Sequence, residues 1–311
     1  MAATNLTEGV KPYAEAFDEL VCSPSLTAQV RQQIVAVSAV NIFLAVVAFL
    51  GNSLILVALQ KESSLRPPTK LLFRCLATSD LCVGLMAQPL KAVYSVSLLH
   101  RDWNNCKRVY AALSVTAFTL VLVSLLTLTA ISIDRYLALS LGLRYRQVVT
   151  LKRTYIVVAI TWIKSIFAAA LYPIDFRITI SYGYVVIPLC VGASFVLYTR
   201  IFRTLRHRSN EVQDLVHQTN SLNIARYRKA VYSALSVQLV LLMCYSPFAV
   251  VEISVVTKRE LSSSYLLAWV ITGTVVFLNS SLNPFLYCWK ISEMRQAVKQ
   301  TIRQAFYCPR E

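Results

Sequence analysis

Two charged residues, Asp134 and Arg135, directly follow a long apolar stretch, LLTLTAISI at residues 125–133. Charged side chains are costly in hydrocarbon, and where they occur there they mark functional positions. Asp80 is another isolated carboxylate in an apolar run. Covalent chemistry is not indicated, because the sequence has no phosphate-binding glycine loop, nucleophile elbow or zinc-spaced histidine set. The pattern predicts a protein that is not an enzyme and in which these charges mark functional positions.

The elements that position these charges are long apolar runs. Of the 311 residues, 56% are hydrophobic and only 15% are charged, whereas soluble domains carry roughly 25% charged residues. Each run is close to the ~20 residues that a helix needs to cross a bilayer, and none alternates as a barrel strand would. The sequence predicts an all-α membrane protein, a bundle of seven transmembrane helices. The runs cover residues 34–59, 71–90, 109–133, 154–174, 182–199, 231–251 and 264–289.

Three regions follow from this pattern: an extracellular N-terminal segment at 1–33, a transmembrane domain at 34–289, and a cytoplasmic segment at 290–311. The last contains MRQAVKQTIRQAF, in which apolar residues fall on one side of a helix and Arg295, Lys299 and Arg303 are among the polar ones. Such a helix lies on the inner leaflet. Cys308, just beyond it, is a candidate for palmitoylation or an unmodified thiol.

Lysine and arginine set the orientation, because they concentrate in cytoplasmic loops. They cluster in the connections after the first, third and fifth runs, which places the N-terminus outside and the C-terminus inside. The net charge of +16 therefore reflects topology and attraction to anionic lipid in the bilayer, and not binding of nucleic acid. We expect a multi-pass protein of the plasma membrane, with a glycosylation sequon at Asn5 on the outside.

Six motifs occur in order, each in or directly after a different run. They are Asn52 in GNSLIL, Asp80 in LATSDL, Asp134-Arg135-Tyr136 after the third run, Trp162 in the fourth, Pro247 in CYSP, and Asn279, Asn283, Pro284 and Tyr287 in NSSLNPFLY. With these motifs the chain resembles the rhodopsin-like (class A) G-protein-coupled receptors over essentially its whole length. The resemblance implies a receptor that converts binding of an extracellular ligand into activation of a heterotrimeric G protein, with arrestin as a further partner.

The resemblance also assigns roles to residues. Asp134 restrains Arg135 at rest, and the freed Arg135 lies under the G protein on activation. Leu143 matches an apolar residue that inserts into the G protein, and the two prolines are hinges. Tyr245 replaces the usual Trp, and Tyr227 replaces a Glu that pairs with the arginine in many relatives, so we expect signalling without ligand. The coupling and switch residues are Asp134, Arg135, Tyr136, Leu143, Tyr245, Pro247, Asn283, Pro284 and Tyr287.

A sodium site is the one cofactor site that the resemblance implies. In the family, polar side chains from three helices enclose a sodium ion with water. The matching residues are Asp80, Ser124, Asn279, Ser280 and Asn283. The alternative is a hydrogen-bonded cluster without an ion.

The ligand pocket expected from the resemblance is apolar, with charges only near its mouth. Ala117 stands where amine receptors need a carboxylate, and Phe277 where opsins need a lysine, so neither ligand class is expected. A small molecule, a lipid and a peptide remain open. For Lys91, snorkelling to the outer interface is an alternative to facing the pocket. The pocket residues are Lys91, Ala117, Phe118, Val121, Tyr245, Phe248, Glu252 and Phe277.

The usual extracellular disulfide of the family is absent, because Tyr110 occupies the cysteine position and the second outer loop, placed at about 174–181, has no cysteine. Cys106 and Cys22 either pair with each other or remain free. A short loop without cysteine resembles the melanocortin, cannabinoid and lysophospholipid receptors, a branch related to adenosine receptors. Two other functions remain as alternatives: a transporter or channel, and a receptor-like scaffold without G-protein coupling.

Overall fold

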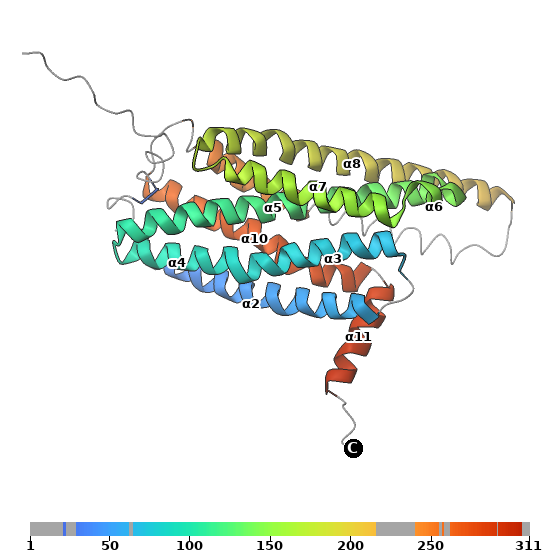
Figure 1. Ribbon diagram of the computed structural model, residues 1–311, viewed down its shortest axis with the longest axis horizontal. Coiled ribbons are helices and arrows are strands. Elements are labelled where there is room, and N and C mark those ends of the chain that lie inside the picture. The colour runs from blue at the N-terminus through green and yellow to red at the C-terminus, as the bar shows by residue number, and fades with distance from the viewer. Residues whose placement is uncertain are drawn as a thin grey trace, which may run out of the picture.

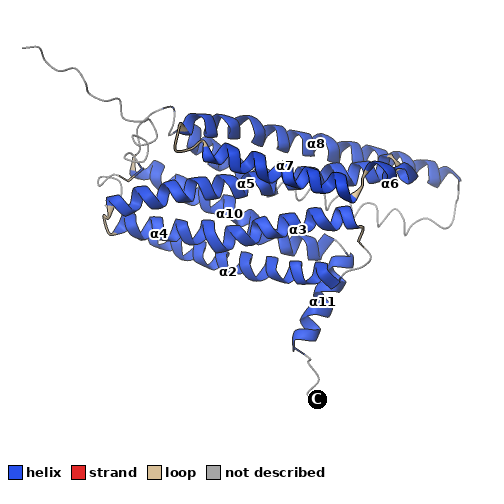
Figure 2. Ribbon diagram, in the orientation of Figure 1, coloured by secondary structure: helices blue, strands red, loops and turns tan. Residues whose placement is uncertain are grey.

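The computed structural model describes residues 21–22, 29–61, 65–215, 240–254, 257, 262–290 and 292–306. In these ranges helices are joined by short turns and loops, and no strand occurs (Figure 2). The helices are α2 Arg31–Lys61, α3 Pro67–Cys82, α4 Gln88–Leu99, α5 Trp103–Ser140, α6 Tyr145–Val148, α7 Leu151–Ala170, α8 Phe176–Leu215, an unlabelled helix Val240–Ser254, α10 Ser263–Lys290 and α11 Ser292–Phe306. A π-helical turn, Val83–Ala87, joins α3 to α4, and a 3-10 turn, Gly142–Arg144, precedes α6.

The long helices lie side by side in one elongated bundle (Figure 1). Six described helical stretches are long and apolar enough to cross a membrane, and Val240–Ser254 is a shorter apolar helix within the sixth predicted run. The rest of that run, residues 231–239, lies outside the described residues. Helices satisfy their own backbone polar groups, which hydrocarbon requires. The predicted fold, an all-α bundle of seven membrane-crossing helices, is therefore the fold of this chain.

Several helices extend beyond the apolar runs that predicted them. The third predicted run covers 109–133, but α5 extends from Trp103 to Ser140. The reason is that an apolar run marks only the part of a helix within hydrocarbon, and the helix continues into water at both ends. The second outer loop is also shorter than predicted, because α7 ends at Ala170 and α8 already begins at Phe176.

Close contact between α2 and α10 depends on a glycine. A methyl group at Gly51 would lie 2.9 Å from Cγ of Pro284, so only glycine allows this approach. Asn52 reinforces the contact, because its side-chain amide donates to the carbonyl of Ser280 at 3.1 Å as well as to that of Ala48 at 2.8 Å. The proline of α10 is thereby held against α2.

Helix α11 leaves the bundle at an angle (Figure 1) and packs against α2 and α10. Met294, Ala297 and Val298 are buried on one side, while the three cationic side chains Arg295, Lys299 and Arg303 are exposed. Lys61 at the end of α2 donates to Gln304 Oε1 at 2.5 Å. The structure thus contains the amphipathic helix that the sequence predicts.

Candidate functional site

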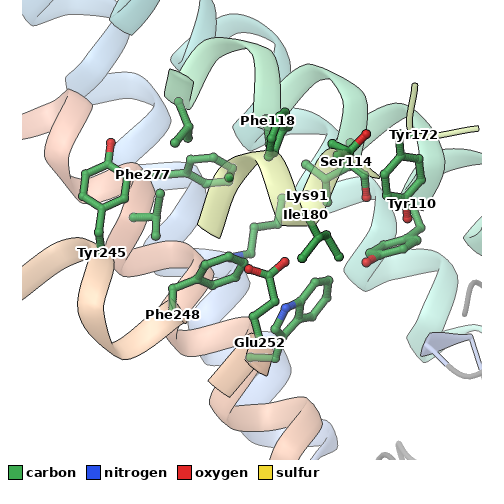
Figure 3. A pocket seen from close by; sticks show the side chains of 18 of the residues that line it. Lys91, Tyr110, Ser114, Phe118, Tyr172, Ile180, Tyr245, Phe248, Glu252 and Phe277 are labelled. Atoms are coloured by element: carbon green, nitrogen blue, oxygen red, sulfur yellow. The ribbon is translucent and has the colours of Figure 1, made fainter. Parts of the chain in front are cut away.

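A cavity of about 160 Å³ lies between α4, α5, α8, Val240–Ser254 and α10 (Figure 3). Its wall is mainly aromatic and aliphatic. All eight predicted pocket residues line it, namely Lys91, Ala117, Phe118, Val121, Tyr245, Phe248, Glu252 and Phe277. Sequence reasoning missed Trp269, Val270, Gly273 and Val276 on α10, although their spacing of one, three and three residues is that of one helix face.

Lys91 faces the cavity, so the alternative in which it snorkels to the outer interface is wrong. Its side chain is 7% exposed, and its Nζ donates to the carbonyl of Val270 at 2.9 Å and to Oγ1 of Thr274 at 2.8 Å. That ammonium also lies 5.3 Å from the ring centre of Phe277. The cause is the π-helical turn before α4. Its extra residue rotates the side chains of α4 away from the directions that they would have if a regular α-helix continued from Asp80.

Glu252 lines the same cavity from the Val240–Ser254 helix. Among the described residues Glu252 forms no ion pair, with Lys91 or with any other cation. The hydroxyl of Tyr184, another lining residue, is buried without a hydrogen-bond partner, and the Glu252 carboxylate acts on it electrostatically. The cavity therefore holds a lysine and a glutamate that do not pair with each other.

Cys22 and Cys106 form a disulfide, with their Cα atoms 6.0 Å apart. The bond fastens the N-terminal segment to the first turn of α5, at the end of the bundle nearest the cavity. Tyr94 strengthens the junction by donating its hydroxyl to the carbonyl of Val21 at 3.4 Å. Tyr110, which stands where the family has a cysteine, is instead buried in an aromatic cluster with Tyr94 and Trp269.

Asp80 is fully buried at the centre of a polar cluster. Its two carboxylate oxygens accept from Ser124 Oγ at 3.2 Å and from Asn283 Nδ2 at 2.7 Å. Asn279 and Ser280 are buried as well, and Oδ1 of Asn283 and Nδ2 of Asn279 have no hydrogen-bond partner. Buried amide groups without partners indicate space for an ion or water. The five residues predicted for a sodium site thus include the oxygen ligands that such an ion requires.

The other end of α5 carries a second polar network. Asp134 is 3% exposed and accepts from Arg135 Nη2 at 2.9 Å, Thr69 Oγ1 at 3.0 Å and the hydroxyl of Tyr145 at 2.6 Å. Burial and the hydrogen bond to Asp134 raise the pKa of Tyr145, so its phenol stays protonated and keeps donating. The Arg66 guanidinium stacks over the same ring at 4.4 Å. Sequence reasoning missed Thr69 and Tyr145, because they reach Asp134 from other helices.

Arg135 is the exposed member of this network, since 45% of its side chain is accessible. Leu143 lies in the 3-10 turn that follows α5 and is 95% exposed. Gly142 permits this turn, because its φ of +50° is in the left-handed region that other residues avoid. Tyr136 is half-buried and packs on Ile201 of α8. An arginine and a leucine are thus presented together at one end of the bundle.

Proline interrupts three of the described helices: α8 at Pro188, Val240–Ser254 at Pro247 and α10 at Pro284. Pro247 leaves the carbonyl of Met243 without its helical donor, while the neighbouring Ser246 donates to Leu242 at 2.7 Å. The side chain of Tyr287, and all of Asn5, Tyr227 and Cys308, lie outside the described residues.

Comparison with known proteins relates the chain to a large family. Residues 51–177 and 171–287 match the family model described as 7 transmembrane receptor (rhodopsin family). The chain is 26% identical over 304 residues to adenosine receptor A2a of Canis lupus familiaris, covering 85% of this chain and 71% of that receptor. It is 23% identical over 299 residues to adenosine receptor A3 of Ovis aries, covering 86% and 90%. It is 25% identical over 310 residues to adenosine receptor A2b of Gallus gallus, covering 84% and 86%.

Proposed function

The chain belongs to the rhodopsin family of seven-transmembrane receptors, and we propose that it binds its ligand in the cavity around Lys91 and Glu252 and activates a G protein through Arg135. Membership makes it a G-protein-coupled receptor, a multi-pass membrane protein that responds to an extracellular ligand, and neither an enzyme nor a transporter or channel.

The observation that carries the proposal is that one helix, α5, reaches from the cavity to Arg135. Val121 lines the cavity, and Arg135 follows fourteen residues later, about 21 Å along the helix axis. A ligand that shifts α5 or its neighbours at one end therefore acts on the Asp134–Arg135 pair at the other. Breaking that pair frees a guanidinium that already has access to solvent.

The hinges for this change are the two prolines. Pro247 weakens the helix that carries Tyr245 and Phe248 of the cavity wall, and Pro284 weakens the helix next to Asp80. Outward movement of the segment before Pro247 opens a cleft at the inner face, in which the G protein meets Arg135 and Leu143. Asn283 and Tyr287 belong to the same moving part of α10.

The Asp80 cluster fits a sodium ion, held by Asp80, Ser124, Asn279, Ser280 and Asn283. The unpartnered amide atoms of Asn279 and Asn283 support an occupant in addition to the hydrogen bonds that Asp80 accepts. A sodium ion held there would supply the positive charge that a buried carboxylate otherwise lacks.

The N-terminus faces outside at the plasma membrane. The Cys22–Cys106 disulfide supports this orientation, because disulfides persist in oxidising compartments. Asn5 is then a glycosylation site. Helix α11, with its exposed cations, rests on the anionic inner leaflet, where Cys308 is a palmitoylation site. Arrestin shares the inner cleft with the G protein.

The test is guanine-nucleotide exchange by G proteins in membranes that contain the receptor. Exchange above that of receptor-free membranes is expected without ligand, and Arg135→Ala should abolish it. A matched control is Arg295→Ala, which removes an exposed arginine of α11 and should leave exchange unchanged. Equal exchange with wild-type receptor and with Arg135→Ala, at equal amounts in the membrane, would refute the role of Arg135.

A further inference from the structure

The chemical class of the ligand can be inferred from the cavity, and this inference rests on the proposed function. Lys91 is a buried ammonium whose two hydrogen-bond acceptors, the Val270 carbonyl and Thr274 Oγ1, are both neutral. An ammonium has three N–H donors, so one remains for a ligand. Burying a charge without an opposite charge is expensive. A ligand that places an anion at Lys91 removes this cost.

Glu252 is a half-buried carboxyl group that lacks a cationic partner in the described part of the chain. It shares the cavity with Lys91 but forms no ion pair among the described residues. The Tyr184 hydroxyl, buried without a partner, lies within electrostatic reach of the Glu252 carboxylate. A carboxylate and a phenol oxygen can both accept from one ammonium group. A cationic group of the ligand therefore fits at Glu252.

The rest of the cavity fixes the size and character of the ligand. Its volume is about 160 Å³, and a dry cavity of about 150 Å³ accommodates a benzene molecule. Aromatic side chains form much of the wall, including Phe118 and Phe248 (Figure 3) and also Trp269. Rings of this kind stack on a flat apolar group. The apolar part of the cavity therefore accommodates one aromatic ring.

We propose that the ligand is a small zwitterion, an aromatic amino acid or a close analogue, whose carboxylate pairs with Lys91, whose ammonium pairs with Glu252 and whose ring occupies the apolar cavity. A neutral nucleoside, the class of ligand named by the related adenosine receptors, leaves both charges of the cavity uncompensated. The two charges of the ligand, and not its ring, then provide most of the discrimination.

The test compares three molecules that share one ring. L-phenylalanine carries both charges, 2-phenylethylamine lacks the carboxylate and 3-phenylpropionate lacks the ammonium. Binding to wild-type receptor in nanodiscs is measured by calorimetry, with adenosine as a neutral comparison. A charge-assisted contact is worth about 1.5–3 kcal/mol, so each analogue should bind about 10- to 100-fold more weakly than L-phenylalanine. Adenosine should be weaker than L-phenylalanine too.

Two variants test which side chain of the receptor recognises each charge of the ligand. With Glu252→Gln the preference for L-phenylalanine over 3-phenylpropionate should disappear, and with Lys91→Met the preference over 2-phenylethylamine should disappear. The matched control is Ser114→Ala, an uncharged lining residue, which should keep both preferences. The wild-type panel needs no variant, so a variant that fails to fold leaves the proposal testable.

Two results would overturn the inference: equal binding of the three phenyl compounds, or tight adenosine binding that both charge variants leave intact. Ligand-free nucleotide exchange in the same preparations separates this failure from failure of the proposed function. If exchange still depends on Arg135, only the ligand class is wrong. If that dependence is also absent, the proposed function fails as well.

Discussion

Removing the charge of Asp134 should raise signalling without ligand. The perturbation is Asp134→Asn, which keeps the size of the side chain. Tyr145 can still donate to the amide oxygen, and the Thr69 hydroxyl can turn to accept from the amide nitrogen. Only Arg135 loses its acceptor, because its Nη2 now faces the N–H donors of the new amide. The change therefore removes the restraint on Arg135 and leaves most of the network intact.

The magnitude follows from the exposure of the pair. Asp134 is buried, but 45% of the Arg135 side chain is accessible, so solvent screens the interaction. A pair of this kind is worth about 0.5–1 kcal/mol. If the active state is a small minority, the same free energy raises its population by about 2- to 5-fold. Ligand-free exchange should rise by that factor.

The assay is ligand-free nucleotide exchange in membranes, divided by the number of receptors that antibody labelling detects. The double variant Asp134→Asn with Arg135→Ala serves as the control and should show no exchange above receptor-free membranes. Exchange by Asp134→Asn that equals or falls below the wild-type level would refute the view that Asp134 restrains Arg135.

Three further predictions concern packing, the ion and the inner end of the sixth run. Gly51→Ala should destabilise the receptor by about 1–3 kcal/mol, since its methyl group would lie 2.9 Å from Cγ of Pro284; thermal unfolding checks this, with Gly192→Ala, which meets nothing within 4 Å, as the control. Sodium should raise the unfolding temperature of the wild type but not that of Asp80→Asn. Potassium should raise the unfolding temperature of neither protein. Tyr227→Glu should lower ligand-free exchange by supplying a second partner for Arg135, and unchanged exchange would contradict that pairing.

The apolar runs were enough to predict the bundle, because crossing hydrocarbon leaves the chain few options other than apolar helices. Asp134 and Arg135 stood out for the same reason, since charges at the end of such a run are rare. The cavity wall on α5, with Ala117, Phe118 and Val121, followed from the resemblance to the rhodopsin-like receptors. The motifs that carry this resemblance can be read along the chain without the structure.

Other features depend on geometry that the sequence does not display. The π-helical turn at Val83–Ala87 changes the direction of Lys91, and no residue in VGLMA marks such a turn. Thr69 and Tyr145 reach Asp134 only because α3 and α6 pack against the end of α5. The separation of Lys91 from Glu252 likewise depends on how three helices pack, so their lack of an ion pair appears only in the structure.

The central claim is that the inner face opens when a G protein binds. The most direct measurement is a spin-label distance between Ser140→Cys, at the end of α5, and Ser233→Cys, in the sixth predicted run, by double electron–electron resonance. The receptor is compared alone and with a nucleotide-free G protein, and Arg135→Ala provides the control. We predict a longer distance with the G protein, and no change for Arg135→Ala. An identical distance distribution in the wild-type receptor with and without a bound G protein would contradict the account.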